Sequence, residues 1–508
     1  MIAVPPDCSP ANDVIAFLAR QAGGPPLETH ISLLFVGADT VWKLKKPVRL
    51  PFLDFTCIDD RRRFLERELA LNGPAAPGMY RDVVPLLRRA DGAVVFGDTG
   101  SAEPPAAIDW VLRMARVAAD DFLDAMAAAG RLDPPTLDAL ADAVASYHAH
   151  CALAQVDISQ SMRAVTNGNA RSARHAGLPE AAVADWENSV QAMLDALAEW
   201  QTGRARAGFV RRAHGDLHLG NVCLWRGKPV PFDALEFDER MASIDLGYDV
   251  AFLLMDLDQR VGRAAANRVL NRYVARRDDA DFTRALPPYL SQRAMVLAHV
   301  RATRGHPDLS RQYFDAALSY LRPAPPIVAA IGGLQGSGKS TLARALAPSL
   351  GRAPGALILR SDEIRKRLHG AAPEQHLPAY AYTDAASAAV FASMAEAAGQ
   401  VTAGGHAMIA DATFIDPAHR HAIAAAARAA QVPFVGIWLD APVPVLEARI
   451  AARSGDASDA TPAVLRASAQ APTIPPPTWH RLDATDPALL TRTADLVRAV
   501  LSLPRQPC

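Results

Sequence analysis

The sequence has few cysteines, and none are arranged for disulfide or metal chemistry. Only five occur among the 508 residues, at Cys8, Cys57, Cys151, Cys223 and Cys508. No two of them have the spacing of a CxxC motif or a zinc finger. An odd, dispersed set of this kind is typical of reduced thiols in a cytosol, so we expect a cytoplasmic protein.

Long apolar runs and an excess of charge of one sign are also missing. No stretch reaches the roughly 18 consecutive apolar residues of a membrane helix, and the start, MIAVPPDCSPANDV, lacks the regions of a signal peptide. The 53 basic and 54 acidic residues give a net charge of -1. No global field therefore draws nucleic acid or an anionic membrane to the chain, and we expect a soluble protein without a membrane partner. The oligomeric state has no signal in the sequence.

What the sequence does have is enough apolar material for several cores. Apolar residues make up 50% and charged residues 21%, an ordinary globular balance. The length favours about three domain-sized units of roughly 150 residues. We place a strand-rich lobe at 1–115, a mostly helical lobe at 116–320 and a third domain at 327–508. The stretch LRPAPP at 321–326 has three prolines and predicts a stiff linker.

The first two predicted regions differ in secondary structure, which indicates two lobes. Strand formers flank a short turn at 31–46 and predict a hairpin. A polar helix is predicted near 58–72 and a strand at 108–117. Further on, Asp133 is a predicted N-cap that precedes two prolines and an apolar pattern of helical spacing. A second helical stretch covers about 182–202.

Beyond the linker, short apolar runs alternate with helical segments. IVAAI leads into a glycine-rich turn and a helix, and ALILR, AMIAD and PFVGIWL each lead toward another helical segment. This alternation is typical of βαβ units, and it predicts a parallel, doubly wound sheet.

The stretch GGLQGSGKST at 332–341 has residues in the order that binds nucleotide phosphates. It fits the pattern GxxxxGK[ST] between a strand and a helix. Glycines let backbone N–H groups turn toward the phosphates, the lysine adds charge at the outer phosphates, and the serine hydroxyl can bind Mg²⁺. The predicted nucleotide contacts are Gly333, Gly336, Ser337, Gly338, Lys339, Ser340 and Thr341, and Ser340 is also a predicted metal ligand.

Two carboxylates and two arginines downstream are candidates for the chemistry. Asp362 follows a strand and is predicted to activate the acceptor hydroxyl, with a role in holding a metal-bound water as the alternative. Asp411 ends another strand, in the place of a Walker-B carboxylate, and is a predicted metal ligand. Arg449 and Arg453 are four residues apart, and we predict that they close over the transferring phosphoryl group. Helix N-caps and a solvated basic face are the structural alternatives.

These motifs resemble the small P-loop kinases of the gluconate kinase, polynucleotide kinase and zeta-toxin type, over about residues 327–500. The resemblance implies phosphorylation of a small molecule or a nucleotide end. The basic cluster RKR at 365–367 has no interleaved aromatic residues. We therefore do not expect nucleic acid as the acceptor.

A second motif, HGDLHLGN at 214–221, has the spacing of a kinase catalytic loop. In that arrangement Asp216 accepts or orients the proton of the acceptor hydroxyl, and Asn221 binds Mg²⁺. Asp233 follows twelve residues later, where kinases place a second metal-binding aspartate. A zinc site is the other interpretation, since two histidines lie four apart. It is disfavoured because glycines predict a turn there, and no glutamate completes an HExxH motif.

The second motif resembles those of aminoglycoside phosphotransferases and their sugar and choline kinase relatives, over about residues 30–260. The resemblance implies a strand lysine, for which we choose Lys43 over Lys45, and a helix partner, for which we choose Glu68 over Glu66. One departure is that no GxGxxG precedes the lysine, where VGADT forms only a short turn. In the helical stretch at 244–257, which follows this motif, Asp245 and Asp249 are expected to be structural. His148 lies on an earlier predicted helix and is expected to be packed in the core.

Together the two motifs predict a bilobal protein-kinase-like fold followed by a doubly wound, parallel-sheet P-loop NTPase domain, an α+β and α/β multidomain chain. The tandem resembles a bacterial family of fused aminoglycoside phosphotransferase-like and P-loop kinase proteins. We expect a bifunctional kinase that uses ATP and Mg²⁺ to phosphorylate hydroxyls of small molecules, such as sugar, aminoglycoside-like or nucleotide-like acceptors. The alternatives are a chain with one catalytic half and one regulatory or substrate-docking half, and a nucleotide-sensing module without turnover.

Overall fold

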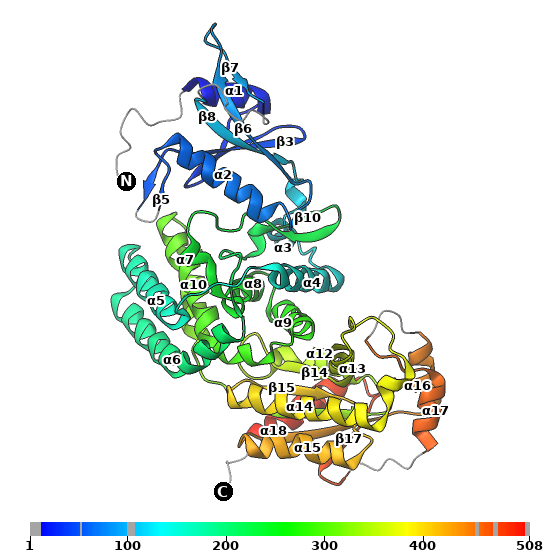
Figure 1. Cartoon of the computed structure of the whole chain (residues 1–508). Coiled ribbons are helices and arrows are strands. Elements are labelled where there is room, and N and C mark those ends of the chain that lie inside the picture. The colour runs from blue at the N-terminus through cyan, green and yellow to red at the C-terminus, as the bar shows by residue number, and fades with distance from the viewer. Residues whose placement is uncertain (1–11, 51–52, 99–106, 453–456, 471–475, 503–508) are drawn as a thin grey trace. The chain divides into compact units, whose positions relative to one another are not determined.

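The computed structural model describes residues 12–50, 53–98, 107–452, 457–470 and 476–502 (Figure 1). The chain divides into two compact units. The first comprises Met1–Ser161 and Trp200–Val250, and the second comprises Met162–Glu199 and Ala251–Cys508. The predicted boundaries at 1–115, 116–320 and 327–508 remain a prediction. Within the described ranges, none of the helices has the length and apolar character that a membrane crossing requires.

An antiparallel sheet of six strands forms the core of the first unit. Helix α1 (Asn12–Ala22) packs on one face of the sheet, and α2 (Ile58–Asn72) packs on the other. In spatial order the strands are β1 (Leu27–Glu28), β2 (Ser32–Val36), β3 (Thr40–Lys45), β8 (Asp109–Ala115), β6 (Tyr80–Arg88) and β7 (Val94–Phe96). The hairpin, the helix at 58–72 and the strand near 108–117 are thus confirmed.

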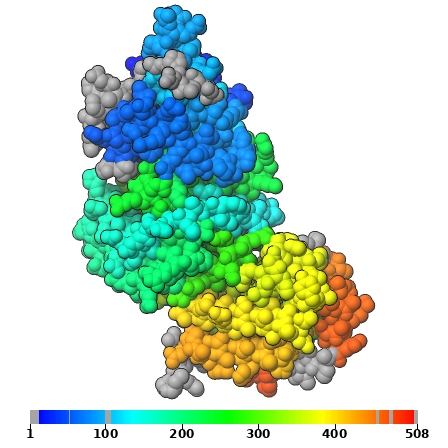
Figure 2. All heavy atoms as spheres, viewed as in Figure 1, coloured from blue at the N-terminus to red at the C-terminus, as the bar shows by residue number. Residues whose placement is uncertain are grey.

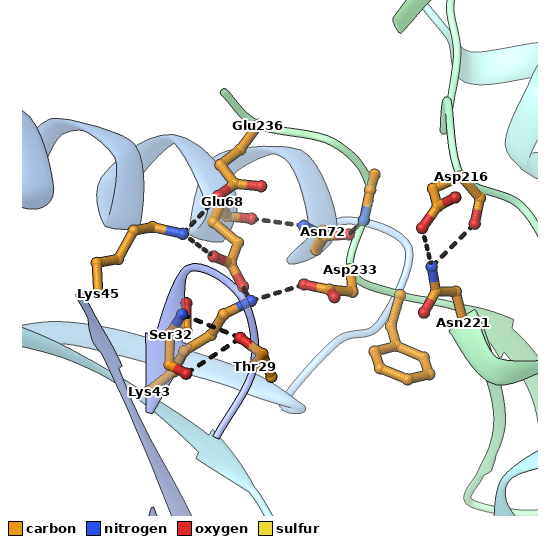
Figure 3. A network of polar contacts seen from close by, with 12 residues as sticks. Thr29, Ser32, Lys43, Lys45, Glu68, Asn72, Asp216, Asn221, Asp233 and Glu236 are labelled. Carbon is orange, nitrogen blue, oxygen red and sulfur yellow. Dashed lines mark hydrogen bonds and ion pairs between the residues drawn. The ribbon is translucent and has the colours of Figure 1, made fainter. Parts of the chain in front are cut away.

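Strand β3 places an apolar side chain on one face of this sheet and charged side chains on the other. Side chains alternate along a strand, and Leu44 packs into the apolar cluster beneath α1. Lys43 and Lys45 consequently point to the opposite face, toward α2 (Figure 3). This alternation places two lysines beside the helix that carries Glu68.

Short strands and helices complete the first unit. Asp133 caps α4 (Pro134–His150), because its side chain accepts a 2.9 Å hydrogen bond from the Thr136 N–H. The remaining elements are α3 (Leu123–Ala128), β9 (Val210–Arg212), β10 (Val222–Trp225), β11 (Lys228–Pro231), α7 (Glu239–Ala242) and β12 (Ser243–Asp245). Three helices contribute residues to both units: α5 (Ile158–His175), α6 (Glu180–Arg206) and α8 (Leu246–Arg260).

The second unit contains a parallel sheet of five strands, as predicted. In spatial order they are β14 (Leu357–Arg360), β15 (Met408–Asp411), β13 (Val328–Gly333), β16 (Phe434–Asp440) and β17 (Trp479–Asp483). Strands β13, β15 and β16 are buried along nearly their whole length, as expected for a sheet covered on both faces. The edge strand β17 was not anticipated, because the proline-rich sequence before it hides its pattern.

Helices cover both faces of this sheet. The helices α12 (Lys339–Leu346) and α18 (Leu489–Ser502) contact each other, as do α14 (Asp384–Ala403) and α15 (Pro417–Ala429). Figure 2 shows the yellow and orange segments, which include α14 and α15, at the surface of this unit. The other helices of this unit are α9 (Arg263–Arg277), α10 (Leu286–Thr303), α11 (Pro307–Tyr320), α13 (Ser361–Leu368), α16 (Val443–Ala451) and α17 (Pro462–Gln470).

Candidate active sites

The loop between β13 and α12 has a backbone that only glycine accommodates. Gly333, Gly336 and Gly338 have φ values of 137°, 79° and 88°, in the region where side chains with a Cβ are strained. A Cβ on Gly336 would lie 2.6 Å from the Leu446 carbonyl oxygen. The loop therefore turns tightly and leaves its N–H groups near the start of α12, which is the geometry of a phosphate cradle.

Lys339 and Ser340 begin α12 and reach in different directions. The Lys339 Nζ donates hydrogen bonds to the carbonyl oxygens of Gly333, at 3.0 Å, and of Leu334, at 2.9 Å. The Ser340 Oγ donates to Asp411 Oδ2 at 2.6 Å. The hydroxyl and the carboxylate predicted as metal ligands are thus brought together.

A cavity of about 930 Å³ opens at this edge of the sheet. Its lining includes nine of the residues predicted for the second site: Gly336, Ser337, Gly338, Lys339, Ser340, Thr341, Asp362, Asp411 and Arg449. Gly333 is not part of this lining, and it contributes its carbonyl to Lys339 instead. Because parallel strands end together at one edge, residues from distant parts of the sequence meet there.

Asp362 is the second residue of α13, directly after β14. Burial raises the pKa of its carboxyl above the usual 3.8, although the Arg360 guanidinium opposes the shift. The Arg360 Nε lies 3.3 Å from Asp411 Oδ2. The charge of one arginine thus acts on both carboxylates of the cavity, and Asp362 has the raised pKa that suits a group that takes up a proton.

The structure describes one of the two arginines that were predicted to close over the phosphoryl group. Arg449 in α16 lines the cavity, and its Nη2 donates a 3.1 Å hydrogen bond to the Ala484 carbonyl oxygen. Arg453 lies outside the described residues.

Sequence reasoning missed a cluster around Asp459 at the mouth of this cavity. The Asp459 carboxylate accepts from the buried Lys366 Nζ at 3.0 Å, from the Leu377 N–H at 3.1 Å and from the Tyr382 hydroxyl. Its neighbour Ser458 hydrogen-bonds Asp362. The acidic stretch GDASDA is plain in the sequence, but no local pattern indicates the partners of Asp459.

The first unit brings Lys43, Glu68 and Asp233 together as predicted (Figure 3). The Lys43 Nζ lies 2.6 Å from Glu68 Oε1 and 2.7 Å from Asp233 Oδ1. Burial works against the charged ammonium, but the Asp233 and Glu68 carboxylates together raise the pKa of Lys43 well above its usual value. The alternative partner, Glu66, instead pairs with Arg62 at the exposed surface of α2, so Glu68 is the residue that faces the lysine.

Asp216 and Asn221 lie against each other in the loop after β9. The Asn221 Nδ2 donates to the Asp216 carbonyl at 2.9 Å and to Asp216 Oδ2 at 3.0 Å. The amide is therefore oriented with its nitrogen toward Asp216. The Asp216 and Asp233 side chains are 40% and 43% exposed, so a ligand can reach both.

Buried groups behind this loop fix its backbone. Asp249 accepts from the N–H groups of His214, at 2.9 Å, and Gly215, at 3.0 Å, and its Oδ2 lies 3.1 Å from the His148 Nε2. Asp245 pairs with the buried Arg204 guanidinium. The structural roles expected for Asp245, Asp249 and His148 are therefore supported by direct contacts.

The oxygen groups at both sites suit Mg²⁺ better than a metal ion that needs a full set of protein ligands. Among the described residues, no cluster of three or more His, Cys, Asp or Glu side chains gathers into a ligand set. Mg²⁺ is commonly held by one or two side chains together with substrate phosphates. Ser340 with Asp411, and Asn221 with Asp233, supply that smaller set.

Comparison with known proteins gives a match to a family model and relatives of similar length. Residues 328–473 match the family model of the AAA domain. The uncharacterized proteins Rv2004c of Mycobacterium tuberculosis and Mb2027c of Mycobacterium bovis are each 29% identical to this chain over 479 residues, which covers 91% of this chain and 92% of each relative.

Solved structures of kinases are similar to each part of the chain. A gluconokinase from Sinorhizobium meliloti is 18% identical with a TM-score of 0.25, covering 36% of this chain and 100% of its own. The GDP complex of aminoglycoside 2'-phosphotransferase-IIIa is 14% identical, with a TM-score of 0.33 and coverage of 58% and 91%. A choline/ethanolamine kinase family protein from Mesorhizobium loti is 11% identical, with a TM-score of 0.35 and coverage of 61% and 94%.

Proposed function

We propose that this chain is an ATP-dependent phosphotransferase with one kinase-type site in each unit. Each site would transfer the γ-phosphoryl group of ATP to a hydroxyl of a small molecule such as a sugar, an aminoglycoside-like or a nucleotide-like acceptor. The observation that carries the proposal is that one cavity of the second unit gathers Lys339, the Ser340–Asp411 pair and Asp362.

In the second unit each group has a distinct task. The glycine loop and Lys339 would hold the phosphates, and Ser340 and Asp411 would hold Mg²⁺, which supplies charge neutralisation at the phosphates. Asp362, with its raised pKa, would accept the proton of the acceptor hydroxyl. Arg449 would stabilise the transferring phosphoryl group from the α16 side, because a fixed cation near developing charge lowers the barrier.

In the first unit the same tasks fall to different elements. Lys43, oriented by Glu68, would bind the phosphates. Asn221 and Asp233 would hold the metal, and Asp216 would serve as the acceptor-side base. Support comes from the 2.6 Å and 2.7 Å contacts of Lys43 and from the paired Asp216 and Asn221.

The test is phosphoryl transfer from labelled ATP to a panel of small hydroxyl compounds by the full chain. Lys339→Ala silences the second site and Asp216→Asn the first, so that each product is assigned to one unit. Loss of one product set in each variant supports two sites. A chain in which neither variant loses any product contradicts the assignment.

One observation favours a second candidate function, a single active P-loop kinase whose first unit docks substrate or regulates. The turn at 37–39 that precedes β3 is short and closes on itself, with the Gly37 N–H bonded to the Thr40 carbonyl at 2.8 Å. It offers few N–H groups to cover phosphates. In that case the Lys339→Ala chain would make no phosphorylated product, whatever the acceptor.

A further inference from the structure

Two lysines of β3 share one carboxylate (Figure 3), and their side chains differ in exposure: 11% for Lys43 and 0% for Lys45. Glu68 Oε1 contacts the Lys43 Nζ, and Glu68 Oε2 contacts the Lys45 Nζ at 3.0 Å. Lys43 also contacts Asp233, whose side chain is 43% exposed. Lys45 instead contacts Glu236, and the side chains of Lys45 and Glu236 are 0% and 5% exposed.

The two ion pairs therefore differ in what they can exchange. A phosphate or a metal ion that approaches the exposed Asp233 also meets the edge of Lys43, and either residue can then exchange its partner for the ligand. Lys45 and Glu236 are sealed from solvent, so they keep each other whether or not a ligand is bound. A buried ion pair stabilises a protein little more than apolar residues of the same size would. The best-attested role of such a pair is to fix geometry.

The position of the sealed pair identifies the geometry that it fixes. Glu236 follows Asp233 by three residues. Two more contacts hold the segment Asp233–Glu236 against helix α2 and strand β6. The Ala234 N–H donates to Asn72 Oδ1 at 2.9 Å, and the Asp233 N–H donates to the Tyr80 hydroxyl at 3.0 Å. Lys45 is thus the point where strand β3, helix α2 and the segment with the exposed aspartate meet.

The charges of the cluster agree with this division. Three carboxylates, Glu68, Asp233 and Glu236, face two ammonium groups, Lys43 and Lys45. The surplus negative charge is best neutralised at the exposed member, Asp233, where a divalent cation has access. If Lys43 turns to a phosphate, Lys45 still neutralises Glu68, so the helix carboxylate is never left buried without a cation.

We propose that Lys45 and Glu236 are positioning residues of the first site, which hold Glu68 and Asp233 in register while Lys43 and Asp233 exchange partners with a magnesium nucleotide. Neither residue touches the ligand. This inference rests on the proposed nucleotide binding of the first unit.

The experiment uses the full chain with Lys339→Ala, so that the second site contributes no binding. Mg-ATP affinity is measured by titration at several Mg²⁺ concentrations, and thermal unfolding is recorded for each variant. Glu236→Gln keeps the size of the side chain and removes its charge. Lys45→Met/Glu236→Leu removes both charges of the sealed pair at once, and Glu68 then keeps only its contact with Lys43. Lys46→Met is the matched control, because Lys46 pairs with the exposed Glu28.

We expect the Glu236→Gln and the double variants to bind Mg-ATP at least about tenfold more weakly and to need more Mg²⁺ for half-saturation. The double variant should do so although its unfolding temperature stays close to that of the parent, which separates positioning from mere stability. Lys46→Met should bind as the parent does.

The possible results distinguish a failure of the positioning role from a failure of the proposed nucleotide binding by the first unit. If the parent chain binds Mg-ATP and both variants keep its affinity and Mg²⁺ dependence, the positioning role is wrong and the nucleotide site stands. If the parent binds no Mg-ATP although Lys43 and Lys45 are intact, the proposed function of the first unit fails, and the inference falls with it.

Discussion

Ser340 and Asp411 lie 71 positions apart in the sequence, and the Ser340 Oγ donates a 2.6 Å hydrogen bond to Asp411 Oδ2. The contact arises because β13 and β15 are parallel neighbours, so the helix after one strand begins beside the end of the other. A hydroxyl and a carboxylate at this distance are two oxygen groups ready for one hard cation. The relationship makes several properties of the chain testable.

Removal of the Lys339 charge should abolish most nucleotide binding by the second unit. A charge-assisted hydrogen bond is worth about 1.5–3 kcal/mol, so Lys339→Ala should weaken Mg-ATP binding there by roughly 10- to 150-fold. Calorimetry on the full chain should register the loss of one binding site. Lys228→Ala, at an exposed position of β11, is the control. An unaltered stoichiometry and affinity in Lys339→Ala would refute the phosphate role.

Asp362 and Asp411 should separate in their phenotypes. Asp362→Asn should lower turnover with little change in nucleotide affinity, because in the proposed mechanism its carboxylate accepts the proton of the acceptor hydroxyl. Asp411→Asn should raise the Mg²⁺ concentration needed for half-maximal activity, since a neutral amide binds the cation less well. Steady-state rates over a Mg²⁺ series distinguish them.

The control for this pair is Asp416→Asn. Asp416 caps α15 through a 2.7 Å hydrogen bond from the Ala418 N–H, and asparagine caps a helix equally well. Its rates should match those of the wild type. Swapped phenotypes for Asp362→Asn and Asp411→Asn would mean that the two roles are exchanged.

The acid limb of the pH–rate profile should belong to Asp362. The carboxyl must be ionised to accept a proton, and burial raises its pKa above the usual 3.8. The turnover of the second site should therefore fall as the pH is lowered through this raised pKa, at a higher pH than for an exposed aspartate. Asp362→Asn should remove this limb from the residual activity. A limb that persists in the variant would assign it to another group.

In the first unit, Asp216→Asn should spare binding and cost turnover. A positioned base is worth roughly 10²-fold in rate, or about 3 kcal/mol of barrier. Asn221→Ala and Asp233→Asn should instead weaken metal-dependent ATP binding. All three are measured in the Lys339→Ala chain, with Asp238→Asn, a cap of α7, as control. Wild-type turnover in Asp216→Asn would rule out its role as the base.

Asp249→Ala should destabilise the first unit rather than act on chemistry directly. Its carboxylate accepts from two buried backbone N–H groups, of His214 and Gly215. Each donor left without a partner costs about 1–3 kcal/mol, so we expect a loss of about 3 kcal/mol or more in urea unfolding. Asp195→Ala, from an exposed pair with Arg163, should change stability by less than about 0.5 kcal/mol. Equal midpoints for the two variants would show that the Asp249 contacts are dispensable.

Local patterns predicted the parts of both sites that lie close together in the sequence. The helix at 58–72 has the predicted bounds, and the order of strand, glycine loop and helix around Lys339 is that of the motif. Glycine and charged residues at fixed spacing encode such loops directly. Asp216 and Asn221 belong to this class, since five positions separate them in one turn.

Contacts between distant segments were not predictable in the same way. Lys45 and Glu236 are 191 positions apart, and Lys366 and Asp459 are 93 apart. Each of these residues is an ordinary charged side chain in the sequence. What makes them partners is burial, which depends on how a strand, a helix and a loop pack, and a single sequence carries no signal of that packing.

The position of β13 in its sheet has a consequence for synthesis on the ribosome. Both neighbours of this strand, β15 and β16, follow it far along the chain. When the glycine loop after β13 leaves the ribosome, neither neighbour has been made, and the apolar strand has unpaired edges on both sides. Pairings between distant segments form slowly and expose aggregation-prone surface until they do. The sheet of this unit, and the glycine loop that it supports, therefore cannot be completed before Phe434–Asp440 has been translated.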